Sequence, residues 1–143
     1  MRKVVLVGCG SAIGALLRYV IRDVSVIGTV WNIPADTMLI NVIGAFLIAF
    51  VTVLSAEVWP FDQDIRVGIT TGLLGGFTTF SLICRECTEM IQNGMLLTAE
   101  VYMFMSVAFG LIGIMLGKAS AEKLGDVVEV DEEERMFEES DVI

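Results

Sequence analysis

The sequence predicts an all-α integral membrane protein built as a bundle of four transmembrane helices. The chain has 143 residues, of which 55% are hydrophobic, and its mean hydropathy is +0.77, well above that of an average soluble domain. Four apolar stretches, each close to the ~20 residues that cross a bilayer, follow one another with few internal charges. Because an open chain satisfies its backbone polar groups in lipid only as helices, we expect each stretch to be helical.

The predicted spans are separated by charged or turn-forming segments. Their approximate bounds are 4–21, 37–55, 67–91 and 102–117. Residues 1–120 are therefore expected to form one four-span domain, which predicts a multi-pass protein of a cell (plasma or inner) membrane. Residues 121–143 form an acidic C-terminal tail with four consecutive acids at 131–134. Like charges repel and keep a segment solvated, so this tail is expected to be disordered.

Composition argues against several classes of function. The net charge is −9, which makes nucleic acid an unsuitable partner. With no histidine and only three cysteines, neither a zinc site nor a disulfide framework is indicated. No nucleophile stands beside a base, so no enzyme is expected. A small four-helix, proton-coupled multidrug exporter is an alternative, although the first span lacks the acid such exchange requires; a non-conducting structural or regulatory membrane subunit is another.

Basic residues show a mild preference for one side of the membrane. Five lie near the span ends on the side of both termini, against three toward the other side: Arg2, Lys3, Arg66, Lys118 and Lys123, against Arg18, Arg22 and Arg85. This excess favours cytoplasmic termini. It is too small to exclude dual topology, in which the chain inserts in both orientations.

The third span has a composition that disfavours a continuous helix. Glycine at 72, 75 and 76 and hydroxyl residues at 78, 79 and 81 crowd the middle of an otherwise apolar stretch. Each glycine costs roughly 1 kcal/mol against alanine inside a helix. The pattern therefore predicts a broken third helix. Carbonyl groups freed at such a break can coordinate a cation, and half-helix N-termini can face an anion.

The same segment carries a resemblance to a known family. Residues 75–81, with the sequence GGFTTFS, preceded by TGLL and followed by Glu86, resemble the third-span signature of the CrcB/Fluc family of fluoride channels. Residues 14–19 (GALLRY) and 37–44 (TMLINVIG) are similar to that family's first-span and second-span motifs. The resemblance implies a passive, fluoride-selective channel that exports cytoplasmic fluoride and relieves its toxicity. It also implies an antiparallel dimer in the lipid bilayer, with two pores.

The resemblance further implies particular site residues. A structural Na⁺ at the dimer interface would be held by the backbone carbonyl oxygens of Gly75 and Thr78. The expected pore-lining residues are Asn41, Phe80, Ser81, Ile83, Tyr102 and Ser106. Arg18 and Glu86 match recurrent charged positions of the vestibule. The chemistry is consistent with a hydrated anion, because amide and hydroxyl donors can replace its water and a ring edge presents a positive quadrupole.

Two departures from the family pattern bear on function. Ile83 stands where the second phenylalanine of the family's pore pair is expected, and isoleucine lacks the ring edge. Asp36 stands where glycine is usual. Because some members of the family occur as two unequal proteins that pair, the sequence favours a heterodimer with a paralogous subunit over a homodimer, and leaves both open.

Overall fold

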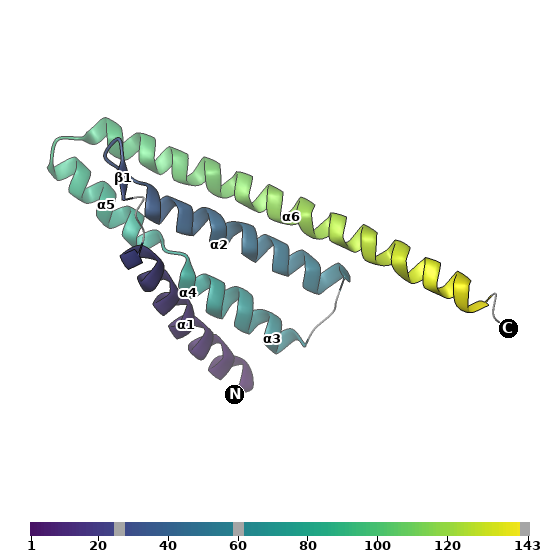
Figure 1. Cartoon of the computed structure of the whole chain (residues 1–143). Helices are drawn as coiled ribbons and strands as arrows, with labels where there is room; N and C mark the ends of the chain where they lie inside the picture. The colour runs from purple at the N-terminus through teal and green to yellow at the C-terminus, as the bar shows by residue number, and fades with distance from the viewer. Residues whose placement is uncertain (25–27, 59–61, 141–143) are drawn as a thin grey trace.

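The computed structural model describes residues 1–24, 28–58 and 62–140, which are almost entirely helical (Figure 1). The elements are α1 (Arg2–Val24), β1 (Thr29–Val30), β2 (Ile33–Pro34), α2 (Ala35–Val53), the π-helix η1 (Leu54–Val58), α3 (Gln63–Val67), the π-helix η2 (Gly68–Leu74), α4 (Gly75–Phe77), α5 (Phe80–Gln92) and α6 (Leu96–Ser140). Within these ranges four helical units are long and apolar enough to cross a membrane, at 2–24, 35–56, 63–92 and 96–128. The all-α fold and the four spans are confirmed.

A short hairpin lies between the first two spans, where the sequence predicts only a connector. β1 and β2 pair antiparallel, and the two residues between them, Trp31 and Asn32, both have positive φ angles of 52° and 63°. Two consecutive positive φ angles are typical of the type I′ turn, which matches the twist of paired strands. Trp31 is 90% exposed. At this end of the bundle its ring is placed to sit at the headgroup level.

The first span packs closely against the third. A Cβ atom added at Gly14 would overlap the carbonyl oxygen of Leu73, and one added at Gly72 would lie 2.9 Å from the carbonyl oxygen of Val7. Small residues permit this approach of backbones, as in other membrane helix pairs. Small residues on both helices therefore bring the two backbones together.

A glycine-capped turn connects α5 to α6. Gly94 has a φ of +76°, and the amides of Gly94 and Met95 donate to the carbonyls of Ile91 and Met90, at 3.0 and 2.8 Å. These two bonds form a Schellman motif, which ends a helix and reverses the chain. The reversal lays α6 on α5, and their contact encloses a small core of Ile83, Cys87, Met90, Ala99 and Tyr102.

The last helix runs along α2 and continues past the ends of the other helices (Figure 1). Gly113 and Gly117 let it approach the backbone of α2 at Val42 and Phe46, respectively. α6 extends to Ser140 and so includes most of the acidic segment for which the sequence predicts disorder. The backbone of that segment is helical in the structure, and its disorder in solution stays a prediction.

Candidate functional site

The third span changes direction between α4 and α5. Thr78 and Thr79 are extended, with ψ of 159° and 121°, and α5 begins at Phe80. Thr79 is the N-cap of α5, because its hydroxyl accepts a hydrogen bond from the amide of Leu82 at 3.3 Å. In a continuous helix that amide would donate to the carbonyl of Thr78. The cap therefore releases the Thr78 carbonyl from the helix.

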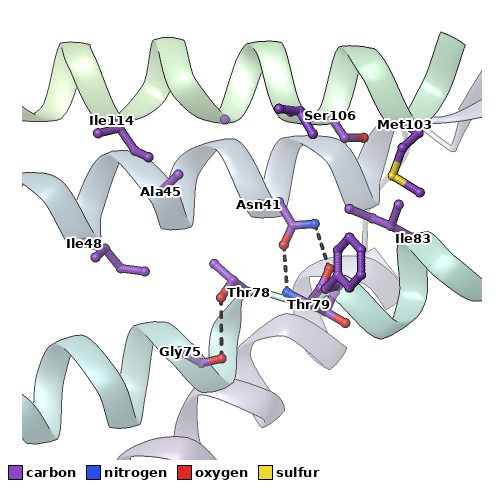
Figure 2. A pocket seen from close by; sticks show the side chains of 13 residues that line it. Asn41, Ala45, Ile48, Gly75, Thr78, Thr79, Ile83, Met103, Ser106 and Ile114 are labelled. Atoms are coloured by element: carbon purple, nitrogen blue, oxygen red, sulfur yellow. Dashed lines mark hydrogen bonds between the residues drawn. The ribbon is translucent and has the colours of Figure 1, made fainter. Parts of the chain in front are cut away.

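Asn41 of α2 binds the interruption through both of its polar atoms. Its amide nitrogen Nδ2 donates to the carbonyl oxygen of Thr79 at 2.9 Å, and its Oδ1 accepts from the amide of Thr79 at 2.7 Å (Figure 2). In a continuous helix the Thr79 amide would donate to the carbonyl of Gly75. Asn41 thus replaces one helical bond and releases a second carbonyl group.

The two released carbonyl groups have different surroundings. The Thr78 oxygen accepts from Nη1 of Arg18 at 2.9 Å, so the first span also contacts the interruption. The Gly75 oxygen receives only a long contact, 3.4 Å from the hydroxyl of Thr78, in the part of the chain that the structure describes. Gly75 is exposed, so its carbonyl is the more accessible of the two.

A pocket of about 480 Å³ lies beside the interruption, between α2, α5 and α6 (Figure 2). Six residues named from the sequence line it: Asn41, Gly75, Thr78, Phe80, Ile83 and Ser106. The rest of its lining is mainly aliphatic. Phe80 is 67% exposed, and Ser106 donates its hydroxyl to the carbonyl of Tyr102 at 2.8 Å. The structure therefore gathers most of the expected pore residues at one place.

One further sequence-predicted residue, Ser81, lies next to this pocket, and Ile83 of the lining is also part of the core. Ser81 is exposed, with its hydroxyl 3.2 Å from that of Thr79. Ile83 is 5% exposed and packs in the core with Tyr102 while also reaching the pocket. Isoleucine at this position therefore fills volume in the α5–α6 contact.

A second cluster surrounds the buried carboxylate of Glu86. Its Oε1 accepts from the hydroxyl of Thr37 at 2.8 Å and from Nη2 of Arg22 at 3.0 Å, and its Oε2 accepts from the hydroxyl of Tyr102 at 2.8 Å. These donors come from α2, α1 and α6, so residues of all four spans meet at one side chain. A buried carboxylate is stable only when it is paired and hydrogen-bonded, as Glu86 is here.

Three members of this cluster were missed by sequence reasoning. In the sequence, Arg22 is noted only as a basic residue near a span end. Asp36 is noted only as a departure from the family pattern, and Thr37 only as the first residue of the second-span motif. Nε of Arg22 lies 3.5 Å from Oδ2 of Asp36. The available signal was that Arg22 and Asp36, which have opposite charges, border the connector between the first two spans and so lie on the same side of the membrane. This signal does not by itself identify their partners.

Comparison with known proteins identifies the family. Residues 5–118, which include both clusters, match the family model described as CrcB-like protein, Camphor Resistance (CrcB). The chain belongs to the CrcB family. The resemblance seen in the sequence motifs is thereby confirmed, and with it a multi-pass membrane protein.

Several curated relatives in the CrcB family have names that state their function. "Fluoride-specific ion channel FluC" of Ruminiclostridium cellulolyticum is 36% identical over 127 residues, covering 89% of this chain and 98% of that protein. The protein of the same name from Hydrogenobaculum sp. is 40% identical over 76% of this chain and 88% of its own length. "Fluoride-specific ion channel FluC 1" of Methanosarcina acetivorans is 33% identical over 87% of this chain and 94% of its own length.

Proposed function

We propose that this chain is a subunit of a fluoride-selective channel through which fluoride leaves the cytoplasm passively. The names of its CrcB relatives support this function. The observation that carries it in the structure is the two-point contact of Asn41 with Thr79, beside a pocket that Phe80 and Ser106 also line. This contact stabilises the interruption in the middle of the third span. Membrane proteins tolerate such an interruption where the freed backbone lines a cavity.

The pocket offers an anion weak donors within a mostly apolar wall. Nδ2 of Asn41 carries two N–H groups, and the contact with Thr79 occupies one of them, so the other can donate to fluoride. Phe80 can present its ring edge, which carries positive quadrupole. An ion must be held well enough to enter and loosely enough to leave. These groups suit conduction better than tight binding.

The direction of α5 adds a favourable field. This helix of 13 residues begins at Phe80, so its N-terminus lies at the pocket. The N-terminal end of a helix carries partial positive charge and exposed amide donors. Broken membrane helices use such half-helix N-termini to face anionic substrates. Fluoride at the pocket would be stabilised in the same way.

A Na⁺ at a dimer centre is part of this proposal. The carbonyl groups of Gly75 and Thr78 are released from helical bonding by Asn41 and Thr79, and unwound backbone carbonyls suit Na⁺. One chain supplies two oxygens, and a second antiparallel copy or paralogue would supply two more. The Thr78 oxygen already accepts from Arg18, but its second lone pair remains available. When bound, the ion would link the two broken helices by electrostatic attraction.

A second candidate function is a subunit without a conducting path of its own. The observation that favours it is Ile83, which is 5% exposed in the α5–α6 core and offers the pocket no ring edge. A paralogous partner would then supply the missing aromatic group, as the heterodimer hypothesis requires. Fluoride-sensitive cells expressing this gene alone test that hypothesis: full rescue without a partner would refute it.

The test of the proposed function is fluoride efflux from liposomes that contain the purified protein alone, with chloride as the control anion. Asn41→Ala removes the amide and Phe80→Ile removes the ring edge. Fast, fluoride-selective efflux that both variants reduce is the expected result. Efflux of chloride at a similar rate would contradict selectivity, and no efflux from well-folded protein would favour the non-conducting subunit.

A further inference from the structure

We propose that Arg22 is a charge-compensating residue of the fluoride path, which fixes Glu86 and offsets the negative charge of Glu86 and Asp36. This inference rests on the proposed function. Arg22 lies in the last turn of α1 and Asp36 in the first turn of α2, so the hairpin returns them to the same end of the bundle. Each charge has the sign that its helix end favours.

The guanidinium group of Arg22 contacts two carboxylates. Nη2 of Arg22 is 3.0 Å from Oε1 of Glu86, while Nε is 3.5 Å from Oδ2 of Asp36. The side chains of Glu86 and Asp36 are 7% and 13% exposed, and that of Arg22 is 38% exposed. A planar guanidinium can bond two acceptors at once, which an ammonium group does poorly. Arg22 therefore contacts two shielded carboxylates at once and offsets one of their two negative charges.

The cluster lies directly beyond the pocket, along the same two helices. Glu86 follows Ile83 by three residues on α5, and Tyr102 precedes Ser106 by four on α6, and both Ile83 and Ser106 line the pocket. Residues three or four apart share a helix face. Ser106 is also bonded to the carbonyl of Tyr102. An anion that moves along this face from the pocket meets Tyr102, Thr37 and Glu86 next.

Two carboxylates at that point would repel an anion. Repulsion between like charges grows as the surroundings become less polar, and Glu86 and Asp36 are both largely shielded from solvent. With Arg22 present, the three charged groups sum to one negative charge, which Thr37 and Tyr102 disperse by donating to Glu86. Without Arg22 the same groups carry two. Arg22 therefore halves the net negative charge that a fluoride ion meets at this point of the path.

The experiment compares fluoride efflux from liposomes for the full-length wild type, Arg22→Gln, Arg22→Lys and the double variant Arg22→Gln/Asp36→Asn. Arg85→Gln is the matched control, because Arg85 makes an exposed ion pair with Glu89 on α5, outside both clusters. Melting temperature is recorded for each protein, so that loss of folding is seen separately.

Arg22→Gln is expected to slow efflux by about tenfold or more, which corresponds to about 1.4 kcal/mol. Arg22→Lys keeps the charge but contacts the two carboxylates less well, so it should retain more of the rate than Arg22→Gln, and Asp36→Asn should restore part of the rate lost in Arg22→Gln. Equal rates for Arg22→Gln, Arg85→Gln and wild type would overturn the inference. A slow Arg22→Gln variant that neither Lys nor Asp36→Asn rescues would also overturn it, in favour of a purely structural role. A folded wild type that passes no fluoride would overturn the self-sufficient channel, and this inference with it.

Discussion

Asn41 ties the second span to the interruption of the third, and its two hydrogen bonds explain why the chain can leave the helical path there. The amide of Thr79 lacks a helical partner, while its carbonyl is that of the N-cap residue of α5 and can accept a second bond, and Thr79 itself is 7% exposed. Asn41 satisfies both groups with one side chain. An asparagine in a span can serve as a link between helices or as a ligand, and the geometry here shows the link.

A substitution at Asn41 should therefore lower stability as well as conduction. Asn41→Leu keeps the volume but leaves the Thr79 amide unpaired, and an unsatisfied buried group costs about 1–3 kcal/mol. We expect the free energy of unfolding in detergent to fall by about 2 kcal/mol or more. Ser106→Ala is the control, because it lines the same pocket but loses only a bond within its own helix. Similar losses in the two variants would contradict this role.

Tyr102 is a fully buried donor to Glu86, with 0% exposure. Tyr102→Phe removes only the hydroxyl and leaves the carboxylate one donor short. Hydrogen bonds to charged groups contribute about 1.5–3 kcal/mol, so we expect a loss of that size in the free energy of unfolding. The chain has two tyrosines, and the other, Tyr19, is 68% exposed on α1. Tyr19→Phe should change stability little, and an equal effect of both substitutions would show that the bond to Glu86 contributes nothing.

At the scale of elements, the contact between α1 and the third span depends on glycines that leave no room for a side chain. Gly14 faces the carbonyl of Leu73 directly, whereas Gly8 on the same helix has no atom within 4 Å of an added Cβ in the described structure. The two positions share a helix and a residue type. They differ in which side of the helix they occupy.

This difference gives opposite predictions for the same substitution. Gly8→Ala should raise stability by up to about 1 kcal/mol, since alanine favours the helix. Gly14→Ala should lower it by about 1–3 kcal/mol, because the backbones must separate. Thermal unfolding of the purified variants measures both effects. Destabilisation by Gly8→Ala as large as that by Gly14→Ala would mean that Gly8 meets another surface, such as a second copy of the chain.

The last helix combines two segments with different surroundings. Up to about Val128 it is apolar enough to cross the membrane, and beyond the other helices it continues alone in the structure (Figure 1). A helix without packing partners is marginal in water, and the acids at 131–134 repel one another. In hydrogen exchange we expect fast exchange at 129–140 and strong protection at 99–117. Strong protection in the tail would instead indicate a bound partner.

At the scale of the whole molecule, the proposed Na⁺ makes assembly depend on the cation present. Ligands that bind only the folded, assembled protein raise its melting temperature in proportion to the logarithm of their concentration. We expect a higher melting temperature in sodium chloride than in N-methylglucamine chloride at equal ionic strength. The difference should grow with sodium concentration. Identical melting curves in the two salts would argue against the carbonyl groups of Gly75 and Thr78 as ligands.

Much of the fold follows from local properties of the sequence. The thickness of a bilayer fixes the length of each span, so four apolar stretches suffice to predict four helices. Glycine and threonine at 72–79 likewise mark where the third span leaves regular helical geometry, since their effect acts on the adjacent backbone. The hairpin at 29–34 gave no such signal, because two-residue strands are too short to show a period.

Partners across the bundle were decided by the tertiary structure alone. Asn41 and Thr79 are 38 residues apart, Thr37 and Glu86 are 49 apart, and Arg22 and Glu86 are 64 apart. Hydropathy and helix propensity describe each residue against its neighbours in sequence, whereas these bonds depend on how the spans are rotated and packed. The sequence by itself therefore determined that the chain crosses the membrane four times and which polar residues lie within the spans. Only the packing decided that Asn41 holds the break and that Arg22 joins two carboxylates.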